Sequence, residues 1–275
     1  MSTITASQSP SLSAAHHHYS RAQEAQTATQ KALATGKKVA DAYDNGAAYA
    51  VAQSLTGQVG ANDATETGLG RGQGLAQVTQ AALVNLQDTS NDAQATLIKL
   101  SDSSLNATDR AAYTQQLNSQ VQQLGSTVAD ASFNGANVLA SGATNQNYVG
   151  NVNGGTSVSI NATNVGSLVS TLTSTTTGSS AQAALAYIKT FQQGIGSAAQ
   201  SVASSQHSIE NQLSANRSQS DALATGSGAI SDADLARGST QSAQNSVQQQ
   251  LAAYAINSIS QQHAQQVGSI SNSLA

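Results

Sequence analysis

The chain has 275 residues, no cysteine or tryptophan, 9% charged residues and a formal net charge of −4. The lack of cysteine excludes a disulfide scaffold or cysteine-ligated zinc, and the ten scattered cations argue against a nucleic-acid surface. Small side chains replace the large apolar ones that build a deep pocket, so we expect no enzyme. No run reaches the roughly 18 apolar residues of a membrane span, so no membrane partner is expected.

The two chain ends resemble each other in charge. Residues 1–20 carry no formal charge, and the stretch 238–275 carries none either. The first 20 residues lack the basic start and continuous apolar segment of a signal peptide, so no cleavable leader is expected. The segments that adjoin these ends on the side of the chain's middle do carry charges. Because both ends differ from their flanks in the same way, we expect the two termini to share one environment.

Apolar residues spaced three or four positions apart predict two helices in the first half of the chain. One stripe covers residues 75–100. The next covers 113–128, and Asp109 is predicted to cap its helix.

The second half contains two further stripes. The clearest, over 188–213, alternates steps of three and four, as a coiled-coil seam does, and predicts a helix over 181–223. The last covers 247–274 and steps mostly by four, and Ser231 or Asp232 is predicted to cap this terminal helix.

The centre, 133–180, has a different pattern, with Asn-Gly, Gly-Gly and Ser-Gly pairs and short alternating runs such as 156–160. These features are typical of turns and hairpins. The predicted fold is therefore mainly α: a long-helix coiled-coil bundle formed by both chain ends, with a small β-hairpin and turn region in the middle.

Histidines and glycines suggest binding sites that the spacing does not support. Residues 16–18 are three histidines, but consecutive helical residues point about 100° apart and do not chelate one ion. His207 and His263 are predicted to have no carboxylate partner and to be packing or surface groups. The glycines of 68–74 lack the Lys and Ser/Thr of a phosphate loop, which leaves a flexible link or a glycine-weakened helix. We expect no metal, cofactor or catalytic residue.

Six short segments follow one another along the chain. They are Ala-Thr-Gly-Lys-Lys-Val at 34–39, the Asp-Asn-Gly-Ala-Ala segment from 44, Gly-Leu-Ala-Gln from 74, Phe-Asn-Gly at 133–135, the hairpin-like 148–160, and Ile-Ser-Asp-Ala-Asp-Leu-Ala at 230–236. In this order they resemble segments of bacterial flagellin. Each is weak alone, but their order and spacing extend the resemblance over nearly the whole chain.

The resemblance implies a structural subunit of the bacterial flagellar filament, a homopolymer used for motility. It further implies that the chain passes unfolded through the flagellar type III export apparatus with an export chaperone. The chain is then secreted into the extracellular filament, beside hook-associated junction and cap proteins. For the Ser/Thr-rich middle, a bare solvated loop and a loop carrying O-linked sugars both stay open.

The resemblance also implies five regions. These are an N-terminal inner-layer helix over 1–38, the N-terminal half of a coiled-coil core over 39–140, a short variable β/loop region over 141–180, the C-terminal half of the core over 181–228, and a C-terminal inner-layer helix over 229–275.

The predicted self-assembly residues are apolar residues of the N-terminal segment and of the stripes. Those of the inner layer are Leu12, Leu33, Val247, Leu251, Ile259, Val267, Ile270 and Leu274. Those of the coiled-coil layer are Leu86, Leu97, Leu117, Val121, Ile195, Val202, Ile209 and Leu213.

Two alternatives stay open. A hook–filament junction protein has flagellin-like ends but assembles only as a short ring, and a filament-borne adhesin or glycosylated antigen would act through the middle region. The segments 74–83 and 230–236 and the small middle region favour the main filament.

Overall fold

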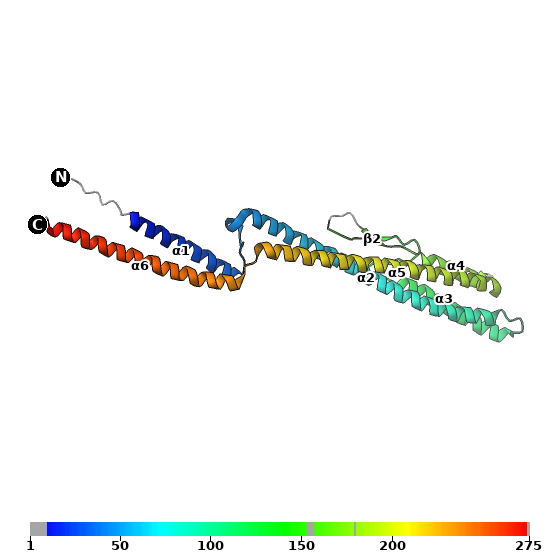
Figure 1. The fold of residues 1–275 in the computed structure, drawn as a ribbon. Coiled ribbons are helices and arrows are strands. Elements are labelled where there is room, and N and C mark those ends of the chain that lie inside the picture. Colours follow the sequence, from blue (N-terminus) through cyan, green and yellow to red (C-terminus); the bar gives the residue numbers. More distant parts are fainter. Residues whose placement is uncertain (1–9, 153–156, 179, 274–275) are drawn as a thin grey trace. The chain divides into compact units, whose positions relative to one another are not determined.

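The computed structural model describes residues 10–152, 157–178 and 180–273, which belong to two compact units. The terminal unit comprises the residues up to Gly57 and those from Leu223 on, and the central unit comprises Gln58–Ala222. The described elements (Figure 1) are, in chain order, α1 (Pro10–Thr35), α2 (Ala42–Leu100), α3 (Ala107–Asp130), β1 (Gln146–Val149), β2 (Ser157–Ile160), α4 (Val165–Gly178), α5 (Ala181–Ser231) and α6 (Leu235–Ser273).

Long helices with one small antiparallel hairpin confirm the predicted fold class. Over the residues that the structure describes, none of the helices combines the length and the apolar character needed to cross a bilayer.

The hydrophobic core lies within the central unit. All members of the main cluster of buried residues fall between Leu69 and Leu213. The stripes predicted over 75–100, 113–128 and 188–213 supply most of them, and Leu75, Leu86 and Phe191 are fully buried. The apolar spacing of three or four residues therefore predicted the buried faces of α2, α3 and α5 correctly, although α5 continues to Ser231, beyond the predicted end at 223.

The N-cap of α3 differs from the prediction. Asn106 Oδ1 accepts a hydrogen bond from the backbone N–H of Asp109 at 2.8 Å, and Asn106 Nδ2 donates to Asp109 Oδ2 at 2.8 Å. The cap is thus Asn106, and the prediction of Asp109 is wrong because Asp109 is the reciprocal partner three residues later.

The middle region contains the expected hairpin. Strand β1 pairs with β2 in antiparallel register, with Gln146 opposite Ile160 and Val149 opposite Ser157. Before it, Asn134 and Gly135 both have positive φ, of 50° and 80°, which fits the tight turn predicted from the Asn-Gly pair.

A helix in the middle region was not predicted. The sequence predicts only β and loop structure for 141–180, but α4 occupies the second half of that range. Val165, Val169 and Leu172 recur every three or four residues and are buried against the core, which outweighs the weak helix propensity of the intervening Ser and Thr.

The glycine-rich segment 68–74 lies inside α2, and two of its glycines admit aromatic rings. A Cβ on Gly72 would lie 3.0 Å from ring carbons of Tyr148, and one on Gly74 would lie 2.7 Å from the ζ carbon of Phe133. Gly68 and Gly70 have open space at the corresponding position. The segment is therefore neither a flexible link nor a phosphate loop, and it fits the turn and hairpin of the middle region against α2.

We expect Gly74→Ala to lower the free energy of unfolding by about 1–3 kcal/mol, because overpacking against Phe133 forces the ring to move. Gly70→Ala is the matched control, since its new methyl group meets nothing within 4 Å. That variant should raise stability by about 0.5–1 kcal/mol through helix propensity. Urea unfolding of the monomer measures both, and equal effects would contradict the packing role of Gly74.

Candidate functional site

Helices α1 and α6 of the terminal unit lie side by side and antiparallel (Figure 1). Polar side chains join them. The contacts are Gln249 Nε2 to the carbonyl of Ala22 at 3.2 Å, Asn245 Nδ2 to Thr29 Oγ1 at 3.2 Å, and Gln26 Nε2 to Ser242 Oγ at 3.1 Å. The seam therefore fixes the register of the pair with hydrogen bonds more than with apolar packing.

Little apolar surface is buried between these two helices. Helix α1 has 26 residues and buries only Ala15 and Ala22, whereas α3, with 24 residues, buries four leucines and valines. Burial of one such large side chain contributes about 1.5–3 kcal/mol, so α1 gains far less from its own chain than α3 does.

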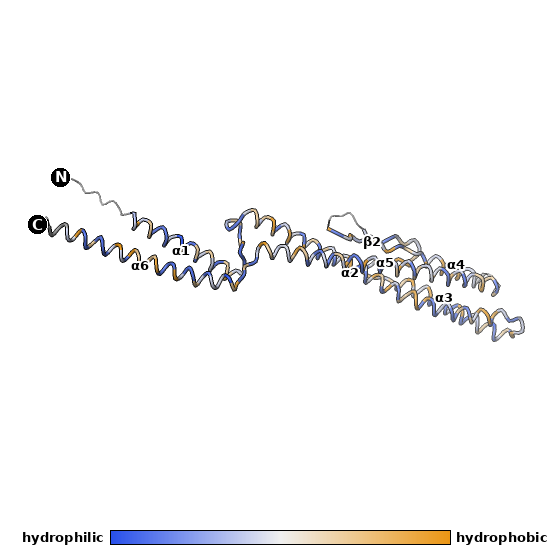
Figure 2. Tube along the Cα trace, viewed as in Figure 1, coloured by the Kyte–Doolittle hydropathy of each residue, from blue (hydrophilic) through white to orange (hydrophobic). Residues whose placement is uncertain are grey.

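An apolar edge on α6, formed by Val247, Leu251 and Tyr254, faces solvent. These side chains are 55%, 64% and 76% exposed, respectively. Asn245 faces α1, and Tyr254 follows nine residues later, which places it about 180° around the helix. Figure 2 shows apolar positions interspersed with polar ones along α6. The apolar edge thus points away from α1.

A groove with a volume of about 650 Å³ runs along one side of the α1/α6 pair. Most of its lining side chains are small, which leaves room for a large side chain from outside. They are Ser11, Ala14, Ala15, His18, Gln248, Leu251, Ala252 and Ala255. Leu251 belongs to both surfaces, because it lies where the groove meets the apolar edge.

The residues predicted for the inner layer do not share one face. Leu12, Leu33 and Ile259 are half-buried, whereas Val247, Leu251 and Val267 are exposed. The side chains of Ile270 and Leu274 lie outside those that the structure describes. Four residues turn a helix by about 400°, so a stripe stepping by four rotates about 40° per step and moves from one face of α6 to another.

Sequence reasoning missed Tyr254 and the small residues of the groove. Tyr254 falls off the four-step stripe, and alanines give no apolar signal in so alanine-rich a chain. Only the alanine spacing at 252 and 255 could have indicated a groove.

The residues predicted for the coiled-coil layer are all buried inside this chain. Each is at most 7% exposed and belongs to the main cluster of the central unit. They are Leu86, Leu97, Leu117, Val121, Ile195, Val202, Ile209 and Leu213. The structure therefore brings them together as an intramolecular core, and a role in contacts between chains stays a prediction.

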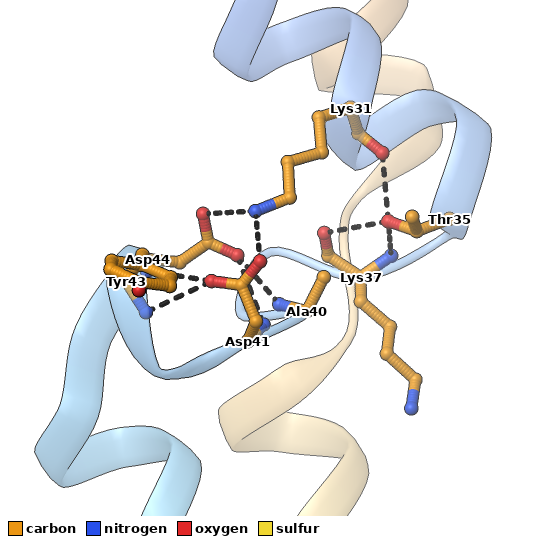
Figure 3. Close-up of polar contacts among 7 residues, drawn as sticks. All are labelled: Lys31, Thr35, Lys37, Ala40, Asp41, Tyr43 and Asp44. Carbon is orange, nitrogen blue, oxygen red and sulfur yellow. Dashed lines mark hydrogen bonds and ion pairs between the residues drawn. The ribbon is translucent and has the colours of Figure 1, made fainter.

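An ion-pair clip closes the turn between α1 and α2 (Figure 3). Lys31 Nζ lies 2.7 Å from Asp41 Oδ2 and 2.7 Å from Asp44 Oδ1. The second oxygen of Asp44 accepts the backbone N–H groups of Ala40 at 2.9 Å and Asp41 at 3.2 Å. Hydrogen bonds from Lys31 hold the pKa of both carboxyls below its usual value, and the two carboxylates raise the pKa of Lys31.

The same turn is tied to the junction between α5 and α6. The backbone N–H of Lys38 donates to the carbonyl of Ser231 at 2.7 Å, and Lys37 forms an antiparallel bridge with Asp232. Asp234 Oδ1 accepts the N–H of Arg237 at 3.0 Å, so Asp234 caps α6. The prediction of Ser231 or Asp232 as the cap is wrong, because both belong to this bridged segment.

Lys31→Met should loosen the turn, because Asp41 and Asp44 lose the cation that brings them together. We expect faster hydrogen exchange at the backbone amides of Ala40 and Asp41 at pH 7. The control is Lys189→Met, at an exposed lysine of the central unit, which should leave the exchange rates of both amides unchanged. Unchanged exchange in Lys31→Met would contradict the role of the clip.

The pH range of the clip follows from the pKa directions. Asp41 and Asp44 have lowered pKa values, so their contribution is present above the unfolded value of 3.8 and is lost as the pH falls through the lower folded values. Lys31 has a raised pKa, so its contribution is present below 10.5 and is lost as the pH rises through the higher folded value. NMR titration of the two carboxyls should therefore give midpoints below 3.8.

No metal site appears in the parts of the chain that the structure describes, since nowhere there do three His, Cys, Asp or Glu side chains gather.

His207 does have a carboxylate neighbour, contrary to the prediction. Its Nδ1 lies 3.5 Å from Glu210 Oε2, one helical turn further along α5.

Comparison with known proteins gives one family for this chain. Residues 7–144 match the model of the bacterial flagellin N-terminal helical region. The chain is 29% identical to flagellin FljK of Caulobacter vibrioides over 233 residues, which cover 84% of this chain and 85% of the relative. It is 29% identical to flagellin FljM of the same organism over 232 residues, with the same shares. A flagellin of Brucella melitensis is 24% identical over 125 residues, or 46% of this chain and 44% of the relative.

Proposed function

The chain belongs to the bacterial flagellin family and is a structural, non-enzymatic subunit of the extracellular flagellar filament, and we propose that it polymerises through its terminal unit. One observation carries the proposal. Helix α1 buries only two alanines within its own chain, while Val247, Leu251 and Tyr254 of α6 are exposed. Contacts with further copies would supply the burial that the single chain lacks.

We propose further that the apolar edge of one copy enters the groove of the next. The groove walls are mostly alanine and serine, and the edge offers valine, leucine and tyrosine. Groove and edge share Leu251 but otherwise consist of different residues, so their contact between copies is head-to-tail. Such a contact repeats from copy to copy and builds an open helical filament when the rotation between copies does not close a ring.

In this proposal residues 1–38 and 229–275 form the inner layer, and 39–140 with 181–228 form the coiled-coil core around it. The region 141–180 lies outermost. The concentration of large buried residues between Leu69 and Leu213 supports a core that folds before assembly. Of the predicted inner-layer residues whose side chains the structure describes, Val247, Leu251 and Val267 are the ones exposed for contact with other copies.

Engineered cysteines test the groove contact without background, because the natural chain has no cysteine. A chain carrying Ala14→Cys in the groove and Tyr254→Cys on the apolar edge should give a ladder of covalent multimers when its polymer is oxidised mildly. The free monomer should give none. A matched chain with Ala14→Cys and Ser170→Cys, an exposed position on α4, should give no ladder. Filaments of the first chain without a ladder, or equal ladders from both, would contradict this contact.

We also propose the export route and partners that family membership suggests. The chain would pass unfolded through the flagellar type III apparatus with an export chaperone and would meet junction and cap proteins at the filament ends. The lack of cysteine supports this route, because no disulfide hinders an extended chain. Loss of the protein from the medium of an export-deficient strain is the expected result.

O-linked sugars on 141–180 belong to the same proposal. Exposed hydroxyl groups along α4, such as those of Ser167, Ser170 and Ser174, support it. Intact mass spectrometry of native filaments should give a mass above the 27.7 kDa of the bare chain, and a mass equal to that value would contradict the modification.

A further inference from the structure

His18 has a special position among the side chains that line the groove between α1 and α6. The other lining residues are Ser11, Ala14, Ala15, Gln248, Leu251, Ala252 and Ala255, and none of them titrates in the physiological range. The groove therefore contains a single histidine, and histidine is the type of side chain that proteins use as a switch around physiological pH.

The two neighbouring histidines do not line the groove. Consecutive residues of a helix point about 100° apart, so His16, His17 and His18 face three directions. His16 Nδ1 lies 3.0 Å from the carbonyl of Leu12, on its own helix. All three histidines are exposed in the single chain, and His18 differs from the other two in lining the groove. The chain thus offers its own control positions beside His18.

No anionic group faces His18 from the helix packed against it. Helix α6 has no Lys, Arg, Asp or Glu after Arg237, and its titratable side chains there are Tyr254, on the far face, and His263. On α1 itself the titratable neighbours are His16, His17, Tyr19, Arg21 and Glu24. Glu24 follows six residues after His18, about 9 Å further along the helix, beyond the range of a direct ion pair.

We propose that His18 makes filament assembly sensitive to pH, because the groove accepts a second copy only when His18 is neutral. The inference rests on the groove contact proposed above. Copies of this chain offer an uncharged apolar edge to the groove, and a protonated imidazole covered by that edge would be buried without a partner. Histidine is the side chain that gains this proton between pH 8 and pH 5.5.

The clip at the α1/α2 turn does not change over that interval. The pKa values of Asp41 and Asp44 are lowered by Lys31, so both carboxyls stay ionised at pH 5.5. A change of assembly between pH 8 and pH 5.5 therefore reports on histidines and not on the clip.

The experiment measures the critical concentration of full-length protein by sedimentation after salt-induced polymerisation at pH 8.0 and pH 5.5. We expect the critical concentration of the natural protein to rise on the order of tenfold from pH 8.0 to pH 5.5, since assembly then competes with protonation of the imidazole in the groove. His18→Gln should reduce that rise to less than about twofold, since no charge forms in the groove. His17→Gln and His263→Gln should keep the full rise.

Three results would overturn the proposal. The first is an equal critical concentration of the natural protein at both pH values. The second is full pH dependence in His18→Gln. The third is failure of both His18→Gln and His18→Asn to polymerise at pH 8.0, because a neutral residue should assemble there. If filaments of the chain with Ala14→Cys and Tyr254→Cys give no ladder of covalent multimers, the groove contact itself is wrong. If that ladder forms but assembly of the natural protein does not depend on pH, the groove contact stands and only the role of His18 is wrong.

Discussion

Leu251→Asp should give a monomer that folds normally and does not polymerise at concentrations at which the natural protein forms filaments. The side chain is 64% exposed in the single chain, so a carboxylate at this position is solvated before assembly. In the proposed polymer it would be buried without a cation, which costs several kcal/mol. A cost of about 3 kcal/mol corresponds to a rise of roughly 100-fold in the critical concentration. Sedimentation measures that rise, and circular dichroism of the monomer should be unchanged.

Asn257→Asp is the matched control for Leu251→Asp. It adds the same charge to α6 at an exposed position, about 120° around the helix from Leu251. We expect this variant to polymerise within a few-fold of the natural protein. Equal loss of assembly in both variants would show that charge on α6, and not the apolar edge, decides the outcome.

Phe191→Ala should lower the free energy of unfolding of the monomer by about 3–5 kcal/mol, because a large core side chain is replaced by a cavity. Phe191 is fully buried and belongs to the main cluster of the central unit. Val247→Ala is the contrasting variant: an exposed side chain of the terminal unit whose loss should change monomer stability by less than about 0.5 kcal/mol. Urea unfolding of monomers measures both.

Together these variants distinguish residues that form the core of the single chain from residues that contact other copies. If Phe191→Ala left monomer stability unchanged and only blocked assembly, the cluster would be a contact between chains and not a core. The same comparison applies to Leu86 and Ile209, which are buried within the chain although they are predicted as assembly residues.

The sequence predicted the helices of the central unit well because their buried faces consist of large aliphatic residues at regular spacing. Leu75, Leu86 and Leu97 stand out against a background of alanine, serine and glutamine. The Asn134–Gly135 turn was equally predictable, since few residues other than Asn and Gly adopt two positive φ angles in succession. These are local signals that need no knowledge of tertiary structure.

Helix ends and α4 were harder to predict. Several polar residues stand near each helix start, and apolar spacing does not show at which of them the helix begins. Asn106 and Asp234 are the caps, and Asp109 and Asp232 are not. Helix α4 depends on burial of Val165 and Val169 against the core, which a window rich in Ser and Thr hides.

The assembly surface was only partly predictable for a different reason. Apolar spacing identifies residues that need burial but does not say whether the same chain or another copy covers them. Val202 and Val247 carry the same signal, yet the first is buried in the core and the second is 55% exposed. Only the packing of the single chain separates the two.

Electron microscopy of salt-induced polymer, with limited trypsin digestion of monomer and polymer alongside, tests most directly that the terminal unit gains its packing from other copies. The cleavage sites in that unit are Arg21, Lys31, Lys37, Lys38 and Arg237. We predict micrometre-long filaments, early cleavage at these sites in the monomer and protection of the same sites in the polymer. Short rings or no polymer, together with trypsin-resistant termini in the free monomer, would contradict the account.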